Sequence, residues 1–257
     1  MTDTRCMPAV FWAHGNPMLT LSDNRYTRAW HALATRLPRP RCILVVSAHW
    51  VTTGVRVTTS GQPATLHDFG GFPQTLYDIT YSAPGAPALA ADVAERLGGQ
   101  GDDRRGLDHG TWTLLRHMYP EADLPVFQVS LDARLHGDGH LALAKRLRPL
   151  RAEGVLIIGS GNVVHNLNLY HGMRAGYPWA QTFVDTLRTH LAQGSCAPLL
   201  DPRTLTADGA LAAPTPEHYW PLLYVLGVRH ENEPLSFPVD GFEGGSISML
   251  SVLVGDA

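Results

Sequence analysis

Histidine is the residue type with the most chemical potential in this 257-residue chain. It occurs thirteen times, whereas lysine occurs once, at Lys145. Neutral imidazole is the commonest transition-metal ligand and is well suited to proton transfer near neutral pH. A Schiff-base enzyme or a phosphate-loop nucleotide hydrolase needs a reactive lysine at a defined turn, whereas Lys145 lies among leucines and arginines at helical spacing. The composition therefore favours histidine chemistry over lysine chemistry.

Three histidines that are far apart in the sequence come directly or shortly after short apolar runs typical of buried strands. They are His14, His49 and His165. In open α/β sheets, ligands bind just outside the carboxyl ends of the strands. We therefore expect these three side chains to share a pocket. The alternative is that each is a hydrogen-bonded histidine at a strand end, with no ligand.

Two further histidines stand where a helix is expected to begin. His218 lies within Pro214–Tyr219, where prolines set the direction of the chain before the last helix. His109 precedes Gly110 at another helix start. Such positions can aim a side chain into a cleft, although either residue taken alone is more often structural than functional.

This histidine set is compatible with a mononuclear metal site of the open, catalytic kind. The spacing differs from the compact pairs of a zinc finger or of an HExxH helix. Two histidines with a carboxylate favour non-haem iron(II), whereas three histidines with water suit zinc as well as iron. Asp68, Asp108 and Glu217 are the carboxylates near the candidate ligands, so the third ligand stays open.

Two other chemistries find little support around Ser160. The segment Gly159–Val164 follows an expected strand, but Val164 stands where a dinucleotide-binding fingerprint has its third glycine. Ile158 replaces the first glycine of the G-x-S-x-G nucleophile motif. Dinucleotide binding and serine catalysis are therefore disfavoured.

The bulk composition limits the class of protein. Twenty basic and twenty-three acidic side chains give a net charge of −3, which provides no general attraction to nucleic acid. No apolar run approaches the roughly 20 residues of a membrane span. Three scattered cysteines and the absence of a convincing signal peptide favour a cytoplasmic protein. No linker divides the chain, so we expect one domain over residues 1–257.

The elements that must position the histidines alternate along the chain. The expected strands are Ala9–Trp12, Cys42–Ser47, Val126–Val129, Val155–Ile158, Leu235–Val239 and Ser246–Leu253. The expected helices are Asn24–Leu37, Pro87–Leu97, Gly139–Arg151, Trp179–Leu191 and Pro216–Leu226. This alternation predicts an α/β layered domain with a central, largely parallel or mixed sheet flanked by helices.

Motifs along almost the whole chain carry a resemblance to a known family. They are His14–Pro17, Ser47–Trp50, His67–Pro73, Asp108–Gly110, Ser160–Leu167, Pro214–Tyr219 and Gly244–Met249. In order and spacing the sequence resembles the class III extradiol ring-cleaving dioxygenases, of the 4,5-DOPA extradiol dioxygenase type. Asn16 is a small departure, because serine often stands there in the family.

The resemblance implies a mononuclear iron(II) site that zinc(II) can also occupy. His14, His49 and His218 match the metal ligands, and His165 matches a histidine that is either a further ligand or the base. More distant relatives use a glutamate as the third ligand, which makes Glu217 the fallback.

The resemblance also implies the reaction and its partners. The substrates are a small catechol and O2, and the product is a semialdehyde acid. His165 accepts a proton from the catechol, and His165 or His109 returns one during ring opening. His67 and the glycines that follow it can form a loop over the substrate. Arg25, Arg28 and Arg174 are candidates for binding a substrate carboxylate.

Two alternatives stay open from the residues themselves. One is a zinc-dependent hydrolase or deacetylase that uses metal-bound hydroxide, with His165 as the base. The other is a non-catalytic protein whose histidines hold a structural ion. Neither the natural catechol, the native metal nor the oligomeric state follows from the sequence.

Overall fold

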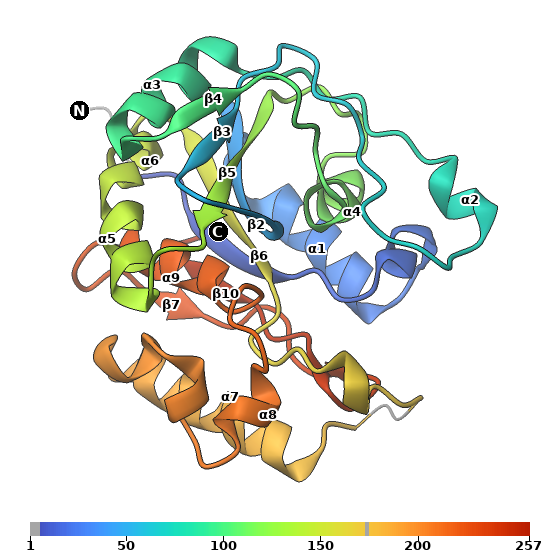
Figure 1. The fold of residues 1–257 in the computed structure, drawn as a ribbon, viewed down its shortest axis with the longest axis vertical. Helices are drawn as coiled ribbons and strands as arrows, with labels where there is room; N and C mark the ends of the chain where they lie inside the picture. The colour runs from blue at the N-terminus through green and yellow to red at the C-terminus, as the bar shows by residue number, and fades with distance from the viewer. Residues whose placement is uncertain (1–5, 173–174) are drawn as a thin grey trace.

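The computed structural model describes residues 6–172 and 175–257, and its centre is an eight-stranded sheet (Figure 1). The strands of this sheet are β1 (Ala9–Ala13), β2 (Cys42–Thr52), β3 (Arg56–Thr58), β4 (Gln100–Asp102), β5 (Val126–Asp132), β6 (Val155–Gly161), β7 (Leu235–Ser236) and β10 (Val252–Val254). Their spatial order is β4-β3-β5-β2-β6-β1-β10-β7. The central strands β5, β2, β6 and β1 are parallel, whereas β10 and β7 extend the sheet in antiparallel pairs. The carboxyl ends of the four central strands therefore meet at one edge.

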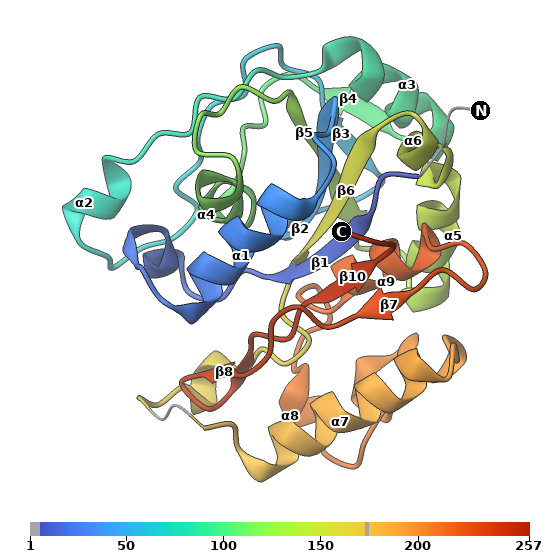
Figure 2. The ribbon, with the colours of Figure 1, turned by 180° about the vertical axis from the view of Figure 1, so that it is seen from behind.

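Helices cover both faces of the sheet. They are α1 (Arg25–Arg36), α2 (Gln74–Tyr77), α3 (Pro87–Leu97), α4 (His109–Met118), α5 (Gly137–Leu147), α6 (Pro149–Ala152), α7 (Pro178–Ala192), α8 (Gly209–Ala212) and α9 (Trp220–Gly227). Helices α3, α5 and α9 lie on one face (Figure 1), and α1 and α4 lie on the other (Figure 2). None of these helices, within the residues that the structure describes, is both long and apolar enough to cross a membrane.

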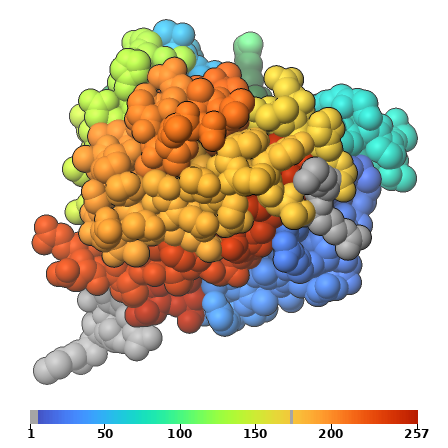
Figure 3. Space-filling view, turned by 90° about the horizontal axis from the view of Figure 1, so that it is seen from below, coloured from blue at the N-terminus to red at the C-terminus, as the bar shows by residue number. Residues whose placement is uncertain are grey.

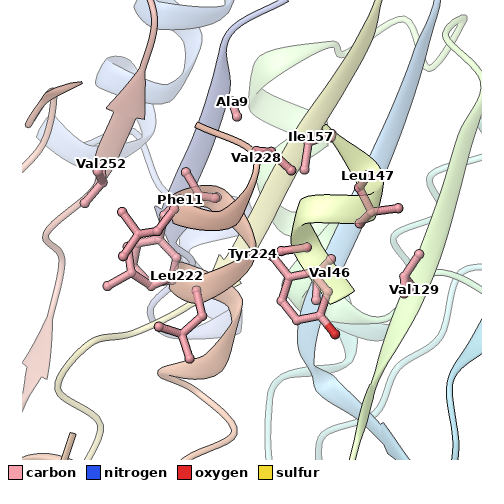
Figure 4. Packing of buried hydrophobic residues seen from close by; sticks show 14 of the residues in the cluster. Ala9, Phe11, Val46, Val129, Leu147, Ile157, Leu222, Tyr224, Val228 and Val252 are labelled. Carbon is pink, nitrogen blue, oxygen red and sulfur yellow. The ribbon is translucent and has the colours of Figure 1, made fainter. Parts of the chain in front are cut away.

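Alternating side chains on the strands explain why both faces are covered. On β1, Phe11 joins the hydrophobic cluster under α5 and α9, whereas Val10 and Trp12 join the cluster under α1 and α4. Successive side chains of a strand point to opposite faces, so a strand that is apolar at every position needs a helix layer on each side. Figure 4 shows Phe11 close to Leu222 of α9, with Tyr224 of the same helix nearby.

A pair of short antiparallel strands and the helices around α7 complete the molecule. Strands β8 (Phe242–Glu243) and β9 (Ile247–Ser248) pair with each other outside the main sheet. Phe183 and Leu187 of α7 join the same cluster as the residues under α9. Seen from below, the yellow and orange segment that contains α7 and α8 covers much of the surface (Figure 3). These elements extend the domain beyond the sheet at the end where the carboxyl termini of the strands lie.

The architecture confirms the α/β fold class expected from the sequence, and the differences lie at the element ends and in elements that were not expected. The helix expected over Gly139–Arg151 is two helices, because Pro149 cannot continue α5 and instead begins α6. The last helix begins at Trp220 rather than Pro216. The strand expected over Ser246–Leu253 is divided between β9 and β10. Strands β3 and β4 were not expected, because each is only three residues long.

Candidate active site

Five histidines line one cavity of about 430 Å³ at the carboxyl edge of the sheet. They are His14, His49, His109, His165 and His218. All five were singled out in the sequence, and they come from the ends of β1 and β6, from β2, from the start of α4 and from the turn before α9. The fold thus brings together side chains that are up to 204 positions apart in the chain.

His14 and His49 approach each other most directly. Their Nε2 atoms lie 3.1 Å apart. His14 follows the last residue of β1, as expected, but β2 does not end before His49 and continues to Thr52. The pairing of β2 with β5 is irregular between Val46 and Val51, a stretch that includes His49. Such irregularities re-aim a side chain, which explains how a histidine inside a strand faces the cavity.

His109 is the third member of the tightest group. The candidate ligand nitrogens of His14, His49 and His109 all lie within 4.8 Å of one another. The ring centres of His49 and His109 are 3.9 Å apart. His109 is the first residue of α4, and both its backbone amide and its Nδ1 contact Oδ1 of Asp68, at 2.9 and 3.0 Å. The Asp68 carboxylate therefore fixes both the start of the helix and the ring.

His218 and His165 form the opposite side of the histidine cluster. Their rings are stacked, with centres 3.6 Å apart and planes inclined by 4°. The ring centre of His218 lies 5.5 Å from that of His14 and 5.0 Å from that of His49. The rings of His14, His49, His165 and His218 therefore surround the same space.

Glycine residues in β6 allow the turn that carries His218 to pack closely against this strand. The amide of Asn162 donates to the His218 carbonyl at 2.9 Å. A Cβ atom on Gly161 would lie only 2.1 Å from that carbonyl oxygen, so any side chain there would displace the turn. Gly159 permits an equally close approach of Pro221. Gly159 and Gly161 are the two glycines of the incomplete dinucleotide fingerprint. Their role in the structure is to let the turn before α9 pack against β6.

Hydrogen bonds on Nδ1 fix the orientation of three of the rings. Nδ1 of His14 lies 3.0 Å from Oγ of Ser160, and this hydroxyl donates its own proton to the Gly110 carbonyl. Nδ1 of His218 lies 3.0 Å from Oε1 of Glu217. With the Asp68 contact to His109, each Nδ1 faces an acceptor, which leaves the Nε2 lone pair free for a metal.

The donor set fits a divalent metal. Two imidazole nitrogens that bind one ion at about 2.1 Å, at angles of about 90–109°, lie roughly 3.0–3.4 Å apart. The 3.1 Å between Nε2 of His14 and Nε2 of His49 falls in this range. Neutral nitrogen donors suit iron(II) and zinc(II).

The surroundings keep the imidazoles of His14, His49 and His165 neutral at pH 7. Burial, reinforced by the neighbouring imidazoles, lowers the pKa of His14 and of His49 well below the usual value of 6.5. Burial and the stacked His218 lower the pKa of His165 to about 3. Neutral imidazole is the form that binds a metal or accepts a proton, so these three rings are in the form that either task requires.

The three carboxylates considered from the sequence have different positions. Asp68 lines the cavity, whereas the Glu217 carboxylate contacts His218 and Thr215, outside the cavity lining. Asp108 is fully buried. It accepts hydrogen bonds from Ser47 at 2.7 Å, Gln128 at 2.7 Å and Arg105 at 3.1 Å.

The Asp108 network supports the backbone of β2 at the site. Arg105 also donates to the His49 carbonyl at 3.1 Å, and Oγ of Ser47 accepts from the His49 amide at 3.2 Å. The buried carboxylate is compensated by this arginine and by the two neutral donors. Asp108 thus stabilises the irregular part of β2 rather than facing the cavity.

Sequence reasoning missed the apolar wall of the cavity and one acid. The apolar and aromatic lining comprises Phe69, Phe72, Leu167, Tyr170 and Ile247, and the acid is Glu243. The HDFGGFP segment carried a usable signal, because apolar side chains that gather at a surface often mark a binding site. For Glu243 the sequence offered no comparable signal, since β8 is only two residues long.

Other expected binding residues lie elsewhere. His67 does not line the cavity, and its Nε2 contacts the Ile79 carbonyl at 3.0 Å, whereas Phe69 and Phe72 of the same loop do line it. Arg25 lines a neighbouring cavity, Arg28 forms a surface ion pair with Asp23, and Arg174 lies outside the described residues.

The chain is similar to known proteins over almost its whole length. Residues 9–244 match the family described as the catalytic LigB subunit of aromatic ring-opening dioxygenase. The chain is 48% identical to a 4,5-DOPA dioxygenase extradiol of Escherichia coli strain K12, over 99% of this chain and 97% of the relative. It is 39% identical to a protein of the same name from Beta vulgaris, over 93% and 92%.

A solved structure has the same fold. The crystal structure of an uncharacterized protein from Escherichia coli K12 aligns with a TM-score of 0.84 and 44% sequence identity, over 97% of this chain and 100% of that one. Neither the family nor these relatives support the hydrolase alternative. The resemblance seen in the sequence is confirmed, and the chain belongs to the LigB family of aromatic ring-opening dioxygenases.

Proposed function

We propose that this dioxygenase cleaves a DOPA-like catechol beside its diol, with O2, to give a semialdehyde acid. The observation that carries the proposal is the convergence of five imidazoles on one cavity that also has an aromatic wall. Phe69 packs edge-on against His109, with ring centres 5.5 Å apart, so an apolar surface lies directly beside the polar cluster. A flat ring with two adjacent hydroxyls matches this combination. The proposal treats residues 1–257 as one catalytic domain.

The metal that we propose is iron(II), held by His14 and His49 together with His218, and zinc(II) can occupy the same donors. Iron(II) when bound supplies a positive charge that lowers the pKa of the catechol hydroxyls and the redox capacity for the reaction with O2. The geometry also supports His109 as a ligand, because its nitrogen belongs to the tightest group. His165 can serve as a further ligand or as a base.

We assign proton transfer to His165 and His109. His165 has no side-chain hydrogen bond to another described residue, and burial keeps it neutral at pH 7, so its ring has a free lone pair toward the catechol. Asp68 holds the proton of His109 on Nδ1, so that Nε2 is the atom that faces the reaction. The carboxylate also stabilises the imidazolium when Nε2 is protonated. His109 is therefore suited to return a proton during ring opening.

Oxygen consumption tests the proposed function. We expect iron(II)-reconstituted protein to consume one O2 per catechol and to form a yellow semialdehyde, whereas zinc-loaded protein consumes none. The measurement is oxygen uptake with product absorbance over a small catechol panel after anaerobic reconstitution. Turnover by the zinc form of an ester or amide without O2, and none of any catechol by the iron form, would contradict the proposal.

Asp68 provides a test of the role of His109. Alanine at position 68 removes both hydrogen bonds to His109, and we expect turnover or metal affinity to fall about 10–100-fold. Asparagine keeps an oxygen acceptor without the charge, so Asp68→Asn should retain more activity than Asp68→Ala. Steady-state kinetics and metal content measure the two effects. Asp78→Asn, at the end of the exposed helix α2, is the control, and an unchanged Asp68→Ala enzyme would refute this role.

A further inference from the structure

The formally charged side chains that line the cavity are all acidic among the described residues. Its lining contains two carboxylates, Asp68 and Glu243, and among the described residues no arginine or lysine belongs to it. Arg25 lines the neighbouring cavity, which shares Tyr170 and Glu243 with this one, but its guanidinium donates to the Tyr26 hydroxyl at 2.7 Å and forms no described ion pair with Glu243. Asp68 is already engaged, because Oδ1 receives two hydrogen bonds from His109 and Oδ2 lies 3.7 Å from Nδ1 of His49. Glu243 is therefore the acid in this lining that has no partner in the histidine cluster.

Glu243 lies directly against the metal-site turn. Its Oε2 accepts one hydrogen bond, from the backbone amide of Asn16 at 3.1 Å. A Cβ atom on Gly15 would lie 2.6 Å from the same oxygen, so the carboxylate touches the backbone next to His14. Gly15 has a φ of +60°, a conformation that suits glycine and keeps this space open. In the described part of the chain no basic side chain pairs with Glu243.

The position of Glu243 on β8 also places it beside the apolar wall. Glu243 pairs with Ile247 of β9, and Ile247 forms a bridge with His165. Tyr170 lines the same cavity, and its ring lies over Gly244, where a Cβ atom would come within 2.3 Å of the ring. Carboxylate and aromatic ring are the two groups that recognise an ammonium ion. Burial raises the pKa of the Glu243 carboxyl, as expected for an acid that lacks a neighbouring cation.

We propose that Glu243, with Tyr170 beside it, binds the positively charged amine of the substrate side chain and makes catechols with an ammonium group the preferred substrate class. The diol end of such a substrate lies at the histidines, and the amine lies at the β8 side of the same cavity. A catechol with only a carboxylate on its side chain is disfavoured, because it places a negative charge near Glu243 without a cation in the described lining. This inference rests on the proposed function.

Substrates that differ only in side-chain charge test the inference. The iron(II) enzyme is compared on dopamine, DOPA, 3,4-dihydroxyphenylpropionate and the neutral 4-methylcatechol. We expect the two amines to have KM values roughly 10–100-fold below that of the acid, as a charge-assisted hydrogen bond provides. Calorimetric titration of the zinc-loaded enzyme with the same compounds should give the same order of Kd values without turnover.

Glu243→Gln isolates the charge, because glutamine has the same shape and keeps an acceptor for the Asn16 amide. We expect KM and Kd for the amines to rise roughly 10–100-fold and those for 4-methylcatechol to change little. The values for the acid should fall, because a repulsion is removed. Asp240→Asn is the matched control, since Asp240 lies on the same segment but pairs with Arg188 at 2.7 Å.

The outcomes separate the two proposals. If oxygen is consumed but the amines and the acid have equal constants, or if Glu243→Gln changes all four compounds alike, the role of Glu243 is wrong and the ring cleavage stands. If no catechol supports oxygen uptake, the proposed function and the inference that rests on it both fail.

Discussion

Replacing His49 by alanine is expected to abolish metal binding and, with it, ring cleavage. His49 and His14 are the pair whose Nε2 atoms lie 3.1 Å apart, so the variant removes half of the closest donor pair in the site. Without the ion, the charge that lowers the pKa of the catechol hydroxyls is lost together with the redox chemistry. Metal content after reconstitution and oxygen uptake measure the two effects separately.

His136→Ala is the matched control, because His136 is exposed and lies before α5, away from the cavity. This variant should retain metal and activity, and His49→Ala should keep a folded far-UV spectrum. A His49→Ala protein that still binds one iron and turns over at the normal rate would remove the basis of the proposed site. The metal contents of His109→Ala and His218→Ala, measured in parallel, identify which of the two is the third ligand.

Replacing Arg151 by methionine is expected to lower the free energy of unfolding by about 3–5 kcal/mol, the usual cost of breaking a buried ion pair. The Arg151 side chain is fully buried and bonds with Glu233 through two nitrogens. It also donates to the carbonyls of Met7 at 2.6 Å and Val228 at 2.9 Å. The variant therefore leaves a carboxylate and two carbonyls without their partner, and Tm should fall by roughly 6–20 °C.

Calorimetry or denaturant unfolding of wild type, Arg151→Met and Arg203→Met checks this expectation. Arg203 pairs with Asp201 on the surface, with more than half of its side chain exposed, so its loss should cost less than about 1 kcal/mol. Equal stability of Arg151→Met and wild type would show that the buried pair contributes nothing.

The same ion pair has a pH dependence of defined sign. Burial raises the pKa of Glu233, but hydrogen bonds from Arg151 and from the His230 amide lower it more, so the folded pKa lies below the usual 4.5. The stabilisation is therefore present above the unfolded pKa and is lost as the pH falls through the folded value. Wild type should lose more stability than Glu233→Gln between pH 6 and pH 3.

The layered fold could be predicted from the sequence because the pattern of apolar residues that indicates each strand and helix is local. Runs such as Cys42–Val46 are apolar at every position, and the helices between them are apolar at every third or fourth position. These periods indicate strands buried on both faces and helices that cover them. The same reasoning placed His14 and His165 at the carboxyl edge, where the structure has them.

The ends of elements were harder to predict, because packing elsewhere in the chain decides them. His49 interrupts the apolar run, so the pattern ends β2 early, although hydrogen bonds from Arg105 and Ser47 hold the strand through this position. Those bonds depend on Asp108, which is 59 residues away in the sequence and whose type suggested a metal ligand. No local pattern distinguishes a carboxylate that binds a metal from one that supports the backbone beside it.

The amino-acid sequence alone determined the alternation of strands and helices, the family, and which five histidines are the candidate site residues. Each of these features can be recognised from residue types and from short spacings along the chain. Tertiary structure decided which nitrogens converge, which carboxylates face inward, and that Glu243 lies beside Asn16, 227 residues earlier in the chain. The physical reason is that these contacts join segments with no pattern in common, so their distances follow only from the packing of the whole sheet and its helices.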